Sequence, residues 1–300
     1  MATAPRLESP SDPPAVRRVG IAPYVKPFLV AFGWALACLG VGLAITVTLE
    51  KLFPNTESPW WLARTGLVQA AGFGVGTWVV GRRLNRRSWA EMGWKDARRA
   101  PAAFTRGLIW GGGAATFAVF LAVVLGGAHV YLHAPGPVFP VGGAVLVGIF
   151  FAALSEEFVF RGYPLGRIAE SVGPVGATLV SAVAFGAAHL MNPEAAWLGA
   201  VNVGLAGAWL AIAFFSPGGM PLAWGVHVGW NATLAALFNA PVSGYDLAIP
   251  GAHYTPGRWE WLDGGLFGPE GGVVGTIAIG IGLALFLRQA RQRAAEHAGA

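Results

Sequence analysis

Charged residues are scarce in this chain of 300 residues. Asp, Glu, Lys and Arg together make up 12% of it, whereas 55% of the residues are hydrophobic and the mean hydropathy is +0.56. Soluble domains carry about 25% charged residues, so this composition excludes a globule with a water-soluble surface. The apolar residues also occur in long runs with few ionisable interruptions. We therefore interpret the chain as a polytopic membrane protein.

Cysteine is almost absent, and repeats are absent altogether. The single Cys38 excludes an intrachain disulfide and a cysteine-based zinc site. The 44 glycines and 21 prolines follow no Gly-X-Y period and fall inside apolar runs, where membrane helices tolerate both residue types. No internal repeat is visible, which argues against a transporter built from duplicated halves.

The sequence also predicts no cleavable signal segment. Residues 1–26 are rich in Pro, Ser and charge, and we interpret them as a disordered cytoplasmic tail. After this tail come apolar stretches of the length that crosses a hydrocarbon core of about 30 Å, which takes roughly 20 helical residues. The sequence predicts an all-α, polytopic transmembrane helix bundle of about eight spans. These spans cover approximately 27–49, 60–81, 105–130, 141–160, 174–198, 199–216, 220–239 and 270–288.

The basic residues predict how the chain lies in its membrane. If the N-terminus and the C-terminus are both cytoplasmic, seventeen of the twenty Lys and Arg residues fall inside, and only Lys51, Arg64 and Arg258 fall outside. This asymmetry follows the positive-inside rule, and it accounts for the sequence pI near 9.8 without any nucleic-acid partner. We expect a multi-pass protein of the inner (plasma) membrane whose basic loops contact membrane lipids.

The chain divides into four parts on this interpretation. Residues 1–26 form the tail, and 27–138 hold the N-terminal transmembrane helices with a basic cytoplasmic loop. Residues 139–240 form a helix core that carries most of the polar groups within the spans. Residues 241–300 supply an extracytoplasmic loop, the last span and a short cytoplasmic tail.

Two adjacent glutamates lie inside the fourth predicted span. A charged side chain at bilayer depth costs at least about 2.5 to 3.5 kcal/mol, so each one needs a partner or a function. Glu157 and Arg161 are four residues apart and can pair on one helix face. Consecutive helical residues diverge by about 100°, which leaves Glu156 on another face with no local counter-charge. Glu156 is therefore a candidate general base or metal ligand.

Two histidines lie within other spans and repeat the spacing of four. Phe185 stands one helical turn before His189, with small residues between them, an arrangement that orients an imidazole in a tightly packed helix. His227 and Asn231 project an imidazole and an amide from one side of the seventh span.

Gly225 and Gly229 share this spacing on another side of the seventh span. They predict the close approach of a neighbouring helix.

Together these motifs resemble the CPBP family, the CAAX proteases and bacteriocin-processing enzymes that include type II CAAX prenyl proteases and Abi-like proteins. The family pattern is Glu-Glu-x-x-x-Arg, then Phe-x-x-x-His, then His-x-x-x-Asn or Asp, on separate membrane helices. All three motifs occur here in that order, and the resemblance covers roughly residues 140–240.

The resemblance implies an intramembrane endopeptidase that hydrolyses a peptide bond of a membrane-associated or prenylated-type peptide or lipidated protein. Glu156 and His189 would activate a water molecule, and His227 and Asn231 would stabilise the developing oxyanion. Three further residues of the motifs would support this site, namely Glu157, Arg161 and Phe185.

A metalloprotease site is the rival interpretation of the same residues. Glu156, His189 and His227 would then hold zinc together with a water molecule. We assign no metal ligand and slightly favour the metal-free glutamate mechanism, because the Asn231 amide is a better oxyanion donor than zinc ligand. No His-Glu-x-x-His motif, no Gly-x-Ser-Gly motif and no Gly-x-Gly-Asp motif occurs, which disfavours the other intramembrane protease classes.

Three functions other than proteolysis stay open at this stage. The first is a non-catalytic membrane scaffold or immunity-type regulator of the same fold. The second is a proton-coupled transporter that uses Glu156 and His189, and the third is a haem site formed by His189 and His227. The sequence does not indicate an oligomeric state.

The depths of the site residues predict a helix break. Glu156 and His227 reach the same membrane level at 1.5 Å per residue, whereas His189 does so only if the fifth span enters the bilayer near Val180. Residues 164–172 would then form an interfacial helix, and Pro193 would end or kink the span. We predict a break just after His189, with a water-accessible cavity that opens toward the cytoplasm.

Overall fold

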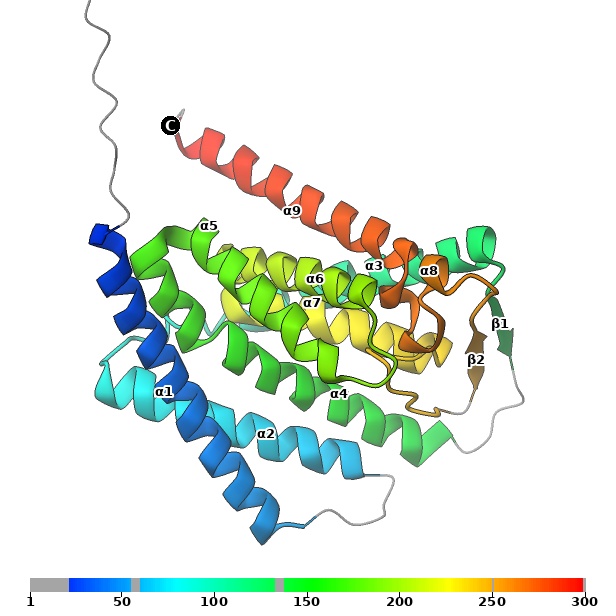
Figure 1. Ribbon diagram of the computed structural model, residues 1–300, viewed down its shortest axis with the longest axis horizontal. Coiled ribbons are helices and arrows are strands. Elements are labelled where there is room, and N and C mark those ends of the chain that lie inside the picture. The colour runs from blue at the N-terminus through cyan, green and yellow to red at the C-terminus, as the bar shows by residue number, and fades with distance from the viewer. Residues whose placement is uncertain (1–21, 55–59, 133–137, 250, 299–300) are drawn as a thin grey trace, which may run out of the picture.

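The computed structural model describes residues 22–54, 60–132, 138–249 and 251–298. Long helices lie side by side along the horizontal axis of Figure 1, and α1 crosses them obliquely on one flank. The predicted all-α class is confirmed for the bulk of the chain. In chain order the long helices are α1 (Ala22–Leu52), α2 (Trp61–Thr77), α3 (Ala100–Gly126), α4 (Val138–Phe160), α5 (Tyr163–Ala188), α6 (Trp197–Phe215), α7 (Gly219–Ala232) and α9 (Val273–Ala298).

Shorter elements extend or connect these helices. A π-helical turn continues α2, a second one continues α7, and a single 3₁₀ turn follows α5. Between α7 and α9 the chain forms the short helix α8 and two more 3₁₀ turns. Their bounds are Trp78–Leu84, Thr233–Leu237, His189–Met191, Glu260–Asp263 for α8, Gly265–Phe267 and Pro269–Gly271.

Every predicted span overlaps a helix. Four segments are long and apolar enough to cross a membrane, and α9 contains a shorter apolar stretch. The number of eight spans and the cytoplasmic position of both termini stay predictions. Residues 1–21 of the predicted tail lie outside the described residues, and α1 begins at Ala22, within the last part of that tail. The four segments are Val25–Leu52, Ala100–Gly126, Val141–Met191 and Trp197–Phe215.

A two-stranded ribbon departs from the purely helical prediction. The third span was expected to continue to residue 130, but α3 ends at Gly126 because Gly127 takes a left-handed conformation with φ of 71°. The next residues form β1 (His129–Leu132), which pairs antiparallel with β2 (Ala252–Thr255). Partners so far apart in sequence leave no local pattern that predicts them, so the pairing appears only in the tertiary structure.

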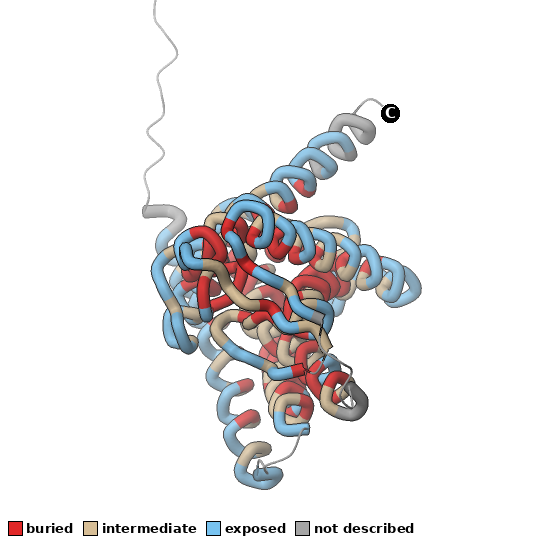
Figure 2. Tube along the Cα trace, turned by 90° about the vertical axis from the view of Figure 1, so that its right-hand side faces the viewer, coloured by how far each residue is buried: buried red, intermediate tan, exposed pale blue. Residues whose placement is uncertain are grey.

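Burial is greatest along α7. Almost every residue of this helix between Gly219 and Trp230 is buried, and Figure 2 shows the buried residues gathered in the middle of the bundle while the outer helices are largely exposed. Many large apolar side chains on the outer helices are exposed, including Ile109 at 71% and Val175 at 77%. Such surfaces suit a lipid environment rather than water.

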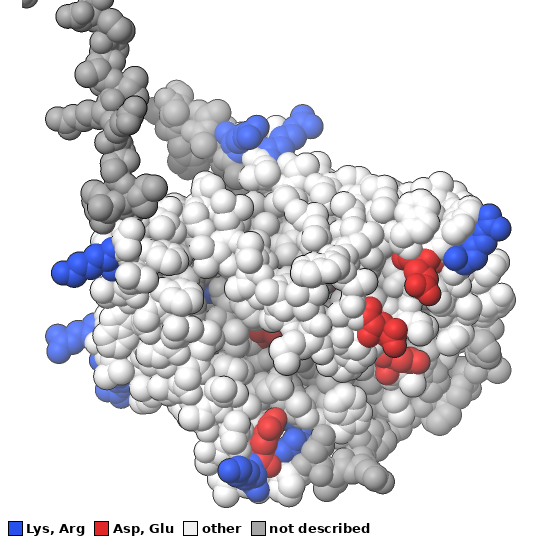
Figure 3. Space-filling model, viewed as in Figure 1, with Lys and Arg blue, Asp and Glu red and all other residues white. Residues whose placement is uncertain are grey.

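Basic residues concentrate at one end of the bundle, as Figure 3 shows for its left-hand edge. Arg87 contacts Glu170 at 2.8 Å, and Lys95 Nζ donates to carbonyl groups at the C-terminal end of α6. The backbone N–H and hydroxyl groups of Ser88 lower the pKa of Glu91 to about 2. These contacts order the basic loop between α2 and α3.

The predicted close approach at the glycines of α7 is confirmed. A Cβ atom on Gly229 would overlap the carbonyl oxygen of Leu108, and one on Gly111 would overlap the carbonyl oxygen of Val226. Helices in a bilayer gain little from apolar burial against each other, so close backbone packing between small residues stabilises their association. The contact involves two glycine pairs with the same spacing, Gly107 with Gly111 on α3 and Gly225 with Gly229 on α7.

We expect Gly111→Leu to destabilise the protein, because the new side chain would push α3 away from α7. Overpacking of this kind costs about 1 to 3 kcal/mol of unfolding free energy. Thermal unfolding in detergent measures the effect. The matched control is Gly113→Leu, two residues along the same helix, where a Cβ atom meets nothing within 4 Å. Equal melting temperatures for the two variants would contradict the packing argument.

Candidate active site

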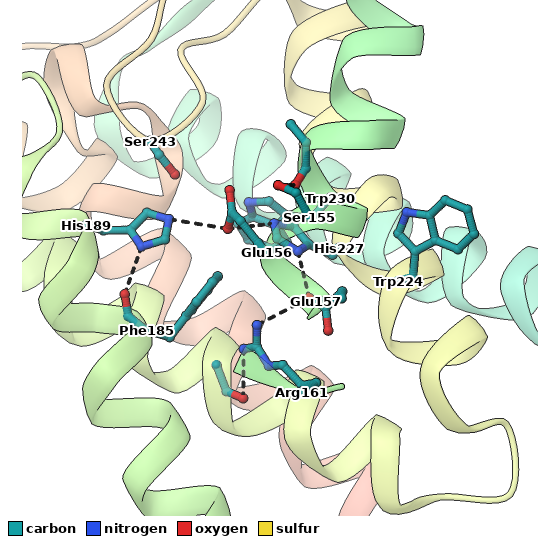
Figure 4. A network of polar contacts seen from close by, with 12 residues as sticks. Ser155, Glu156, Glu157, Arg161, Phe185, His189, Trp224, His227, Trp230 and Ser243 are labelled. Carbon is teal, nitrogen blue, oxygen red and sulfur yellow. Dashed lines mark hydrogen bonds and ion pairs between the residues drawn. The ribbon is translucent and has the colours of Figure 1, made fainter. Parts of the chain in front are cut away.

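Three helices bring the predicted ionisable residues together (Figure 4). Glu156 lies near the C-terminal end of α4, His189 directly after α5, and His227 in the middle of α7. Glu156 Oε2 is 3.9 Å from His189 Nε2 and 3.7 Å from His227 Nε2. The three side chains therefore lie close together, as expected, and their catalytic roles stay predictions.

A break in the helix positions His189. The α-helix α5 ends at Ala188, a 3₁₀ turn follows, and Asn192 is extended with φ of −75° and ψ of 157°. The predicted break just after His189 is confirmed. A second break lies at Gly173, where φ is 74°, and it separates the expected short helix from the rest of α5. The helix resumes at Pro174, since proline needs no N–H partner in a first helical turn. The entry of the fifth span into the bilayer near Val180 stays a prediction.

Hydrogen bonds orient both imidazole rings. His189 Nδ1 lies 2.8 Å from the carbonyl oxygen of Phe185, and His227 Nδ1 lies 2.9 Å from Glu157 Oε1. Both neighbours are acceptors, so both Nδ1 atoms carry hydrogen and donate it; this assignment follows from the partners. In each ring, Nε2 consequently faces Glu156.

Glu157 and Arg161 form the predicted pair, with both side chains fully buried. Arg161 Nη1 donates to Glu157 Oε1 at 3.2 Å, and its Nη2 donates to the carbonyl oxygen of Gly207 on α6 at 3.2 Å. The guanidinium group also lies 4.2 Å from the ring centroid of Phe185. Because Glu157 Oε1 accepts from Arg161 and His227 together, one carboxylate links α4 to α7.

Phe185 fills the space beneath the two histidines. Its ring centroid is 4.6 Å from that of His189 and 5.9 Å from that of His227. It packs edge-on against Phe160 at 5.0 Å. The Phe-x-x-x-His spacing therefore positions His189 by stacking as well as by the backbone hydrogen bond.

A cavity of about 410 Å³ exposes the site. Glu156, His189, His227 and Asn231 all line it, so Asn231 lies where the sequence predicted. The Asn231 amide forms no hydrogen bond within the described part of the chain and is free to donate. Figure 3 shows a hollow near the middle of this face, with acidic surface at its bottom. Further walls come from the N-terminal half of α2, from Ile149 and Ala152 of α4, and from the loop of residues 242–247.

The walls of the cavity come from several separate segments. They include Trp61 and Leu62 at the start of α2 and Tyr245 of the loop. Beside the site, Phe160, Arg161 and Phe185 pack against one another. The opening toward the cytoplasm stays a prediction.

The donor atoms at this site do not form a metal-binding group within the described residues. Among the described residues, no group of three His, Cys, Asp or Glu side chains is arranged to hold a metal ion. Glu156, His189 and His227 present one oxygen and two nitrogen atoms to a common space, but their present spacing does not make a ligand set. We accordingly derive no step through zinc.

Two polar residues at the site were not predicted from the sequence, namely Ser243 of the cavity wall and its hydrogen-bond partner Glu270. Glu270 lies at the start of the eighth predicted span and is buried, at 5% exposure. It accepts hydrogen bonds from Trp230 Nε1 at 2.7 Å and from Ser243 Oγ at 2.5 Å. An acidic residue at the edge of an apolar run was the available signal, because burial of such a group is costly.

Comparison with known proteins agrees with the geometry. Residues 139–233 match the family model described as type II CAAX prenyl endopeptidase Rce1-like. No curated protein and no solved structure matches the chain. The matched segment extends from the start of α4 to the end of α7, and it includes all three motifs. The chain is thus an integral membrane protein that carries, in residues 139–233, the domain of the CPBP family of CAAX-type intramembrane endopeptidases.

Proposed function

We propose that this protein hydrolyses a peptide bond by a metal-free mechanism in which Glu156 and His189 activate water. One observation carries the proposal. Glu156 Oε2 is buried without a hydrogen-bond partner and faces the Nε2 atoms of His189 and His227 at 3.9 and 3.7 Å. Because both Nδ1 atoms donate elsewhere, a neutral histidine offers only an acceptor at Nε2.

Acceptors that face one another need a donor between them. A water molecule held by Glu156 and His189 donates one hydrogen to each and turns its lone pair toward the cavity. As this water attacks the substrate carbonyl carbon, Glu156 takes one of its protons as general base. The protonated Glu156 then returns the proton to the nitrogen of the leaving amine when the carbon–nitrogen bond breaks.

His227 and Asn231 stabilise the oxyanion in this scheme. His227 can donate through Nε2 only as an imidazolium, and Glu157 beside its Nδ1 at 2.9 Å favours that charged form. With His227 charged, the positive charges of His227 and Arg161 balance the negative charges of Glu156 and Glu157. A neutral cluster is the least costly state in an apolar bundle. The Asn231 amide supplies the second donor.

The substrate we propose is a membrane-associated peptide of the prenylated type. The matched family acts on prenylated CAAX peptides by its description. Beside the polar site, the cavity is lined by apolar side chains such as Leu62, Ile149 and Leu247, which suits a lipidated peptide more than a soluble one.

Glu156→Gln should lower the turnover of a quenched farnesylated peptide by at least about a hundredfold, since general bases contribute about 10² to 10⁴. His189→Ala and His227→Ala should each abolish cleavage as well. Purified protein in detergent serves for the assay. Glu260→Gln, an exposed change on α8, is the matched control and should leave turnover unchanged. Full turnover in all three site variants would sink the proposed mechanism and favour a binding role.

Glu157→Gln should destabilise the protein by about 3 to 5 kcal/mol, because it leaves the buried Arg161 without its counter-charge. Adding Arg161→Met should restore much of the melting temperature. Activity should stay low in the double variant, because His227 still lacks the carboxylate that favours its charged form. Melting curves and turnover, measured side by side, separate the two effects. Normal turnover in the double variant would contradict the role of Glu157.

Removal of metal ions should leave activity unchanged. Protein purified without added zinc and treated with a strong chelator is expected to retain its full turnover, since the proposed base and oxyanion donors are side chains. The measurement is turnover before and after chelation, with zinc content determined on the same sample. A loss of activity that zinc restores would replace the proposed mechanism with the zinc alternative.

A further inference from the structure

A tight turn opposite Glu156 brings Ser243 into the cavity. Val242 and Tyr245 exchange two backbone hydrogen bonds of 3.0 and 2.9 Å. Between them, Ser243 and Gly244 both have positive φ, at 48° and 86°, which makes a turn of type I′. Glycine is required at position 244 because a Cβ atom there would overlap the carbonyl oxygen of Pro193.

Ser243 takes an unfavourable backbone conformation in this turn. Left-handed conformations cost a non-glycine residue about 1 kcal/mol, and Asn or Gly usually fills this turn position. Such costs persist where the surrounding structure enforces them, and they cluster at functional sites. The presence of serine at this position is therefore not explained by the turn alone.

The hydroxyl group of Ser243 is locked by Glu270. Its single proton goes to Glu270 Oε1 at 2.5 Å, while Trp230 Nε1 donates to Oε2 of the same carboxylate at 2.7 Å. No cation pairs with Glu270 within the described part of the chain. A hydroxyl group whose proton is committed has only lone pairs left, so Ser243 Oγ can act only as an acceptor toward the cavity.

The orientation of this acceptor fits the site. Figure 4 shows the Ser243 hydroxyl pointing toward the space between His189 and Glu156, and Ser243 lines the same cavity as both residues. Asn192 Nδ2 donates to the backbone carbonyl oxygen of Ser243 at 3.1 Å. This bond ties the turn to the helix break just after His189, so that Ser243 keeps a fixed position relative to the proposed base.

We propose that Ser243 Oγ accepts a hydrogen bond from a backbone N–H group of the bound peptide, and that Glu270 is the positioning residue that keeps the hydroxyl an acceptor. This inference rests on the proposed function and deepens it. A peptide backbone offers both a carbonyl oxygen and an N–H group. His227 and Asn231 provide donors for the carbonyl oxygen. Ser243, on the opposite side of the cavity, provides an acceptor for the N–H group.

The test replaces single N–H groups of the peptide by ester oxygens. The probe is a fluorescent farnesylated peptide whose modified cysteine is followed by three residues, together with its three ester analogues, one at each bond after the cysteine. Affinity is measured on the full-length Glu156→Gln protein, and kcat/KM on protein with an intact Glu156. We expect one ester to bind about three- to tenfold more weakly than the amide, the effect of one neutral hydrogen bond.

Ser243→Ala should abolish this preference for the amide at that bond and leave the other two bonds unaffected. Glu270→Gln should abolish it as well, because the Gln amide can donate to Ser243 Oγ and turn the hydroxyl into a donor. The matched control is Thr276→Val. Thr276 lies on α9, the helix that follows Glu270, and its hydroxyl group donates to Asn202 Oδ1 on α6 at 2.7 Å. The change removes this hydrogen bond at a residue that does not line the cavity, so the preference should persist.

Several outcomes would overturn the inference. An unchanged preference in Ser243→Ala, equal affinity of the amide and all three esters, or loss of the preference in Thr276→Val would each do so. Failure of the proposed function is recognised separately. Absent turnover with an intact amide preference would refute hydrolysis and still support Ser243 as a peptide-binding residue, whereas absent peptide binding would refute both.

Discussion

The carboxylate of Glu157 is the group on which the rest of the structure depends. It accepts hydrogen bonds from Arg161, which directly follows α4, and from His227 on α7. Arg161 continues the network to α6 and to Phe185 of α5. Breaking a buried ion pair of this kind costs several kcal/mol. Four helices are therefore held in one relative position, and displacement of any of them would leave a charge unpaired in an apolar interior.

This network also explains how adjacent glutamates differ in function. Glu157 lies on the face of α4 that meets α7, where its charge is used to orient an imidazole. Glu156, about 100° around the helix, faces the cavity and keeps one oxygen without a partner. The paired glutamate gives rigidity, and the unpaired one is available for chemistry. Glu270 resembles Glu157 in that its carboxylate has hydrogen-bond donors beside it. Its two oxygens accept hydrogen bonds from Trp230 and Ser243, so Glu270 influences the site through Ser243.

Local patterns predicted much of the site because helical spacing converts sequence distance into direction. Glu157 with Arg161, Phe185 with His189, and Gly225 with Gly229 each behave as their spacing of four indicates. The small number of polar side chains in the spans also helped to identify the site, because each one costs free energy to bury in a membrane. Ser243 and Glu270 escaped notice because their contact joins residues of two separate segments, and no spacing rule relates such residues.

The sequence by itself determined the helical class, the grouping of basic residues at one end, and the identity of the polar residues that share the cavity. Each of these follows from composition or from the geometry of a single helix. Only the tertiary structure decided which segments form the walls of the cavity, the ribbon formed by β1 and β2, and the link from Glu270 through Ser243 to the site. These features depend on how separate segments pack. The rings of Phe160 and Phe185, for example, contact each other only after α4 and α5 have met.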